Sequence, residues 1–100
     1  MRRDDVIARL KDTEPALRGF GVAALYLFGS HARDEANTDS DVDVFVDPAS
    51  DVAFGFLPFM DAHETIQKAV GDGAKIDYGT RNGLHPLLKP DIEREAVRIF

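Results

Sequence analysis

Apolar residues recur at helical spacing over residues 3–19, the first patterned stretch of the chain. Pro15 interrupts this stretch, and we expect the helix to kink or restart near Thr13, which could cap a second short turn. Gly19 and Gly21 should then end the helix. The apolar stripe consists of Val6, Ile7, Leu10 and Leu17.

Two further stretches have the pattern of β-strands. Residues 22–28 are apolar almost without a break, as expected for a strand that is covered on both faces. Residues 40–46 alternate between acidic and apolar positions, which predicts one polar and one buried face, and Asp47-Pro48 should end that strand. Residues 75–78 predict a short third strand.

The remaining apolar positions predict helices. Residues 30–34 can form a short helix, and Pro58 suits the first turn of a longer one that carries Met60, His63, Ile66, Ala69 and Val70. A last helix should begin at Pro90, with Ile92, Ala96 and Ile99 on one face. Loops are expected over residues 36–40, 48–56, 71–73 and 79–88. The order of elements predicts an α+β (mixed α/β) fold, a small mixed sheet with helices against it, as a single domain over residues 1–100.

Composition excludes several classes of protein. The 100 residues are 44% apolar, enough for one core, and the net charge of −6 disfavours direct binding to DNA. The absence of cysteine excludes a disulfide scaffold, a thiolate zinc site and thiol catalysis. No apolar run approaches the ~20 residues of a membrane span, and the N-terminus lacks a secretory signal, so we expect a cytoplasmic protein.

Asp41 and Asp43 are the first candidates for chemistry. Two residues apart in a strand, their carboxylates would lie on one face and repel each other unless a cation lay between them. Such oxygen ligands suit Mg²⁺, and two ions about 3.5–4 Å apart can hold the attacking and leaving oxygens of a phosphoryl transfer. The alternative is an exposed strand with acidic residues on its wet face. A calcium loop is excluded, because Val44 and Ser50 stand where it needs glycine and glutamate.

Gly29 and Ser30 follow the first predicted strand and open the short helix. Free amides at a helix N-terminus can bind phosphate, although a Gly-Ser pair alone is equally typical of a simple turn. The two common glycine-rich phosphate loops are absent. The three histidines show no spacing typical of a metal site, and His63 is better explained by packing or a partner contact.

Read together, the two motifs are specific. Gly29-Ser30-His31-Ala32-Arg33, followed by Ser40-Asp41-Val42-Asp43-Val44, resembles the G-S-x-A-R…S-D-x-D-[LV] signature of the minimal nucleotidyltransferases, in the DNA polymerase β superfamily. The resemblance extends over most of the chain, from the leading helix to the later I-D strand. One departure is Asp34, where the family usually has glycine, and this leaves the local loop geometry open.

The resemblance implies an active site. Asp41 and Asp43 would bind two Mg²⁺ ions, while Asp77 would bind the catalytic ion and help to deprotonate the attacking hydroxyl. Gly29 and Ser30 would hold the terminal phosphates of ATP. Arg33 could also contact phosphate, or it could instead tie the short helix to Glu35 or Asp47. Asp61, Glu64 and Asp72 are weaker candidates because none lies on a predicted strand.

The resemblance also implies a function. Members of this family commonly act as antitoxins that transfer AMP from ATP to a tyrosine of a HEPN-domain RNase toxin, so a hetero-oligomer with such a toxin is expected. Because the chain ends at Phe100, we expect no second domain that could bind an acceptor. Two alternatives remain: an antitoxin that acts by binding alone, and a nucleotidyltransferase that modifies a small molecule. Phe54, Phe56 and Phe59 could complete the core or contact a partner.

Overall fold

The computed structural model describes residues 2–37, 40–49 and 54–100. Its elements are α1 (Arg3–Lys11), α2 (Glu14–Gly19), β1 (Val22–Phe28), α3 (Gly29–Ala32), β2 (Val42–Pro48), α4 (Phe56–Val70), β3 (Ile76–Thr80), the 3₁₀ turn η1 (Arg81–Gly83), α5 (Lys89–Glu95) and β4 (Val97–Arg98). None of these described helices is long and apolar enough to cross a membrane.

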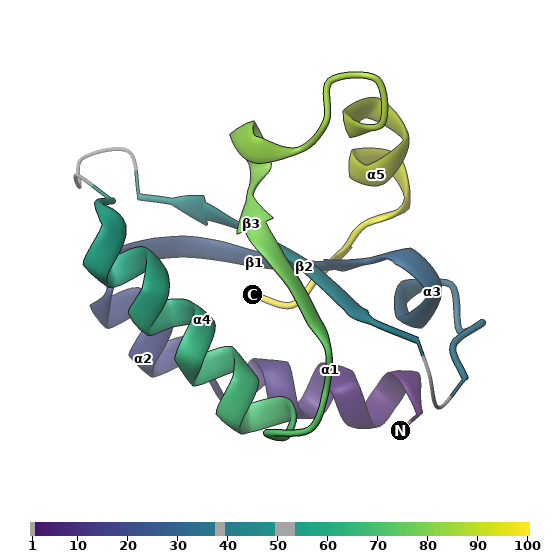
Figure 1. Ribbon diagram of the computed structural model, residues 1–100, viewed down its shortest axis with the longest axis horizontal. Helices are drawn as coiled ribbons and strands as arrows, with labels where there is room; N and C mark the ends of the chain where they lie inside the picture. The colour runs from purple at the N-terminus through teal and green to yellow at the C-terminus, as the bar shows by residue number, and fades with distance from the viewer. Residues whose placement is uncertain (1, 38–39, 50–53) are drawn as a thin grey trace.

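One four-stranded sheet, in the order β3-β2-β1-β4, forms the centre of the molecule. β1 pairs antiparallel with both β2 and β4, whereas β2 and β3 are parallel, with α4 as the connection between them. Helices α1, α2 and α4 cover one face of the sheet, and α5 lies on the other side (Figure 1). The predicted mixed fold is therefore confirmed.

The hydrophobic core lies between the sheet and the layer of α1, α2 and α4. The valine face of β2 is buried in this core as predicted, but the opposite face is not simply polar, because Phe45 on it is also fully buried. The apolar stripe of α1 and α2 packs against them, together with α4. The fully buried core residues include Val6, Leu10, Leu17, Leu25, Leu27, Val42, Val44, Val46, Ala62, Ile66 and Val70.

The first helix breaks where Pro15 predicted a break. α1 ends at Lys11, and α2 restarts with Thr13 at its N-cap position and Pro15 in its first turn. The predicted capping role of the Thr13 side chain is wrong. Its hydroxyl instead donates a hydrogen bond back to the carbonyl of Leu10, so it closes α1 rather than capping α2.

The predicted last helix is wrong in its second half. α5 ends at Glu95, and Ala96 has the extended backbone of a strand, with ψ of 140°. The chain then pairs with β1, where the Ile99 amide donates to the Leu25 carbonyl at 2.8 Å and the Leu25 amide donates to the Phe100 carbonyl at 3.2 Å. Ile99 is buried as expected, but in the sheet layer and not on a helix face.

Several boundaries differ from the predictions by a few residues. β2 begins at Val42 and runs to Pro48, α3 spans Gly29–Ala32, and α4 begins two residues before Pro58. The loops expected over residues 36–40 and 48–56 lie partly outside the described residues.

The aromatic residues near α4 differ in burial. Phe54 packs edge-on against Phe59, which stacks on Tyr78, and Phe54 and Tyr78 both pack against the core. Phe56 is 74% exposed and is available to a partner. His63 stacks on Tyr78 with ring centroids 4.9 Å apart, which confirms a packing role.

Candidate active site

Three neighbouring strands bring the candidate residues together. In the sheet register, Asp43 on β2 lies opposite Phe28 on β1 and opposite Asp77 on β3. Gly29 follows Phe28 directly. The glycine turn and two of the three predicted carboxylates therefore meet at one edge of the sheet, although they are far apart in the sequence.

Gly29 is required here for two reasons. Its φ of +75° lies in the left-handed region that favours glycine. A Cβ atom built on it would also overlap the Oδ2 atom of Asp43. The absence of a side chain thus lets the Asp43 carboxyl group approach the backbone at the start of α3.

The Asp43 carboxyl group is strongly perturbed. Its pKa is raised to about 6, first by burial and then by the negative charges of Asp77 and Asp41 and a hydrogen bond to Asp77, while Arg33 acts in the opposite direction. Two carboxylates this close repel each other when both are ionised, unless a cation lies between them. Asp43 and Asp77 offer oxygen ligands of the type that a hard divalent cation prefers.

Asp41 directly precedes the first residue of β2 and is exposed, so it lies just outside the strand that was expected to begin at residue 40. Its negative charge is nevertheless near enough to help raise the pKa of Asp43. The amide of Val42 donates to the carbonyl of Lys75 at 2.8 Å, which fixes the start of the strand just after Asp41. Within the described residues, no three acidic or histidine side chains are grouped as a metal site. The carboxylates of Asp43 and Asp77 fit a cation, and the role of Asp41 as a further ligand stays a prediction.

Glu95 of α5 is a site residue that the sequence did not reveal. Its Oε1 atom accepts a hydrogen bond from the Gly29 amide at 3.3 Å, and both of its oxygens accept from Nη1 of Arg33 at 3.1 Å. Arg33 also contacts Glu35, as predicted, at 3.3 Å. The Glu95 carboxylate therefore accepts hydrogen bonds from the amide and the guanidinium that, according to the resemblance, would bind phosphate. Ser30, in the first turn of α3, is half-buried.

Arg81 of η1 is a second residue that sequence reasoning missed. It forms a two-pronged ion pair with Asp47, with both N–O distances 2.8 Å, and a third contact with Glu93 of α5 at 2.6 Å. Its guanidinium lies over the rings of Tyr26 and Phe45. Arg81 thus ties α5 to the sheet. Asp47, a predicted partner of Arg33, is bound to Arg81 instead.

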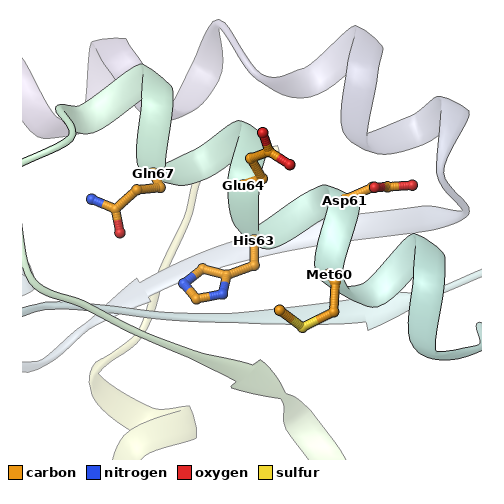
Figure 2. A pocket seen from close by; sticks show the side chains of 5 residues that line it. All are labelled: Met60, Asp61, His63, Glu64 and Gln67. Atoms are coloured by element: carbon orange, nitrogen blue, oxygen red, sulfur yellow. The ribbon is translucent and has the colours of Figure 1, made fainter.

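A cavity of about 300 Å³ adjoins Asp77 on the α5 side of the sheet. Phe28, Leu84, Leu88 and Ile92 contribute apolar walls, and His85 lies at its edge. A second hollow, of about 230 Å³, is lined by residues of α4 alone, among them His63 and Glu64 (Figure 2). Neither Asp43 nor Asp77 lines this hollow. The cavity beside Asp77 is therefore the one that can serve the carboxylate pair.

The fold and this arrangement of glycine turn and acids define a class of protein. Residues 6–99 match the family model described as a nucleotidyltransferase domain, and the chain belongs to that family. It is a nucleotidyltransferase of the minimal, MntA-like type. A solved structure titled "Structure of putative minimal nucleotidyltransferase" superimposes with a TM-score of 0.77 at 27% identity, over 97% of this chain and 95% of that one.

Two relatives are similar in sequence. The chain is 33% identical over 86 residues to the Methanocaldococcus jannaschii protein named "Putative protein adenylyltransferase MJ0435", covering 86% of this chain and 88% of the relative. It is 31% identical over 80 residues to protein adenylyltransferase MntA of Thermococcus cleftensis, covering 80% of this chain and 77% of the relative. A toxin–antitoxin structure with AMP-PNP has a TM-score of 0.63 at 17% identity, over 100% of this chain and 73% of that one, and shows the shared fold alone.

Proposed function

We propose that this nucleotidyltransferase transfers AMP from ATP to a tyrosine of a partner HEPN-domain RNase toxin and so neutralises it, as an antitoxin in the cytoplasm. The observation that carries the proposal is the pairing of Asp43 with Asp77 beside the Gly29 turn. Support comes from relatives that are named protein adenylyltransferases, and from a structural neighbour that is a toxin–antitoxin pair with an ATP analogue.

Each group has a role in this reaction. Asp43, Asp77 and Asp41 would hold two Mg²⁺ ions, which when bound supply positive charge to the reacting phosphate. The Gly29 amide, Ser30 and Arg33 bind the terminal phosphates after Glu95 has moved away. Asp77 accepts the proton of the attacking phenol. The phenol oxygen bonds to the α-phosphorus, the bond from that phosphorus to the bridging oxygen breaks, and pyrophosphate leaves on the Gly29 side.

The test is transfer of label from ATP. The chain, Mg²⁺ and α-labelled ATP are mixed with the HEPN-domain protein encoded beside it, and label is expected on that protein. The double variant Asp41→Ala, Asp43→Ala should lose transfer by at least about a hundredfold, in the range seen when groups that stabilise a transition state are removed. Asp61→Ala, Asp72→Ala is the matched control, since both acids are exposed and lie outside the site. No label with the unaltered chain would reject the proposal.

A second candidate, inhibition of the toxin by binding alone, is favoured by one observation. The Gly29 amide and Arg33 already donate hydrogen bonds to Glu95, so these groups are not free to bind a nucleotide. The same variants separate the two functions. If the Asp41→Ala, Asp43→Ala variant still neutralises the toxin and no label is transferred by the unaltered chain, binding is the function.

A further inference from the structure

The cavity beside Asp77 lies on the side of the site from which an acceptor would arrive. In an in-line displacement, the attacking oxygen enters opposite the leaving group. The groups suited to the leaving pyrophosphate lie at the end of β1, at Gly29 and Arg33. The strand order places Asp43 on β2 between them and Asp77 on β3. The acceptor should therefore approach from β3, where the cavity is.

The size and the lining of the cavity suit an aromatic ring. Gly79 lies on the same strand face as Asp77, two residues further along β3, and opposite Phe45. A Cβ atom at Gly79 would meet no atom within 4 Å, so the cavity is open at this point. Phe28, Leu88 and Ile92 add apolar surface, and the volume of about 300 Å³ can hold an aromatic side chain.

The rim of the cavity indicates a macromolecular occupant. Leu87 is 82% exposed and Leu88 is 56% exposed, next to each other in the segment before α5. A nucleoside inside the cavity would leave the Leu87 side chain uncovered, whereas a protein segment that inserts a ring can also cover the rim. His85 accepts a hydrogen bond from the Leu87 amide through Nδ1 at 3.2 Å, which leaves Nε2 to donate to an oxygen of the occupant.

We propose that this cavity receives the aromatic hydroxyl side chain of the partner protein, with its oxygen at Asp77 and with Leu87 and Leu88 covering the partner backbone around it. This assignment rests on the proposed function. Beyond that function, it specifies where the acceptor side chain binds and which surface selects the partner. The alternative occupant, the base of ATP, becomes an outcome of the test.

Gly79→Val tests the assignment because it fills the cavity without backbone strain. Gly73→Val is the matched control, since a Cβ there also meets no atom within 4 Å and the residue lies in an exposed turn. Two quantities are measured: the Kd of a non-hydrolysable ATP analogue with Mg²⁺, and the Kd of the protein encoded beside this chain, without nucleotide. Gly79→Val should weaken partner binding at least tenfold and AMP transfer likewise, while nucleotide binding stays within twofold.

Two results would overturn the assignment. A tenfold loss of nucleotide binding in Gly79→Val would place the base in the cavity, and unchanged partner binding and transfer would leave the cavity unused. Ile92→Phe fills the cavity from α5 and guards against misfolding of the first variant. Failure of the unaltered chain to transfer AMP would reject the proposed function itself. If the unaltered chain transfers AMP and both Gly79→Val and Ile92→Phe still do so, only the assignment of the cavity is rejected.

Discussion

At the scale of single residues, Asp34 explains the one departure from the nucleotidyltransferase signature. Its φ of 59° lies in the left-handed region, and it is the sole non-glycine residue of the described chain to do so. Glycine adopts this conformation without steric cost, and aspartate tolerates it better than most side chains. The backbone at position 34 thus has the conformation that the glycine usual in the family would adopt.

We therefore expect Asp34→Gly to stabilise the protein by about 0.5 kcal/mol, because relief of the left-handed strain exceeds the added entropy of the unfolded chain. Urea denaturation measures the change. Asp12→Gly is the matched control, since it removes the same charge at an ordinary φ of −64°. It should lose about 0.5–1 kcal/mol. Equal losses for both variants would show that position 34 is not strained.

Glu95 is the residue whose removal should strengthen nucleotide binding. Its carboxylate competes with phosphate for the Gly29 amide and Arg33, so Glu95→Gln should lower the Kd for ATP by roughly fivefold, equivalent to about 1 kcal/mol for a partly exposed ion pair. Titration calorimetry with Mg²⁺ and a non-hydrolysable analogue measures it. Glu35→Gln is the control, because Glu35 also pairs with Arg33, whereas the Gly29 amide donates to Glu95. Weaker binding by Glu95→Gln would mean that Glu95 instead orients Arg33.

At the scale of secondary structure, strands with a clear pattern were predictable and the short edge strand was not. β1 spans the predicted residues 22–28, because an uninterrupted apolar run has few alternatives. β4 has only two residues, too few to show an alternating pattern, and Ile92, Ala96 and Ile99 also fit helical spacing. What decides its structure is the free edge of β1, which lies about 75 residues earlier and leaves no local signal.

Truncation of Ile99 distinguishes the edge strand β4 from the single long helix that the sequence suggested. Ile99 is 5% exposed, so Ile99→Ala should cost about 2–4 kcal/mol through lost burial and the cavity left behind. Ile92→Ala should lower the free energy of unfolding by only roughly 1 kcal/mol, because Ile92 is half-buried on α5. Chemical denaturation of both variants gives the difference. Equal losses would favour the single long helix that the sequence suggested.

At the scale of the whole molecule, the site exists only because distant segments meet. The sequence indicated Gly29, Asp43 and Asp77 separately, and the resemblance joined them, but their meeting depends on the register of three strands. Glu95 and the cavity depend further on the position of α5, which Arg81 fixes through Asp47 and Glu93. Such contacts span tens of residues and leave no periodic pattern in the chain.

Bringing Asp43 and Asp77 together has a cost that should be measurable in the stability of the metal-free chain. The pKa of Asp43 is raised to about 6 in the folded state, above its ordinary value of 3.8, so between these values the folded chain binds more protons than the unfolded chain. The stabilising contribution of this group is therefore fully present below pH 3.8 and is lost as the pH rises through 6. The Asp43→Asn substitution removes this pH-dependent loss of stability, because asparagine does not ionise.

We accordingly expect the metal-free Asp43→Asn variant to exceed the unaltered chain in unfolding free energy by about 1 kcal/mol at pH 7.5, a figure reduced for partial solvent access. The difference should shrink as the pH falls toward 4. Addition of Mg²⁺ at pH 7.5 should stabilise the unaltered chain and leave Asp43→Asn almost unchanged, because the cation relieves the same repulsion. Thermal unfolding with EDTA or Mg²⁺ measures both effects, with Asp61→Asn as the control. A pH-independent difference would show that Asp43 ionises normally, and that the carboxylate pair is not strained in the folded protein.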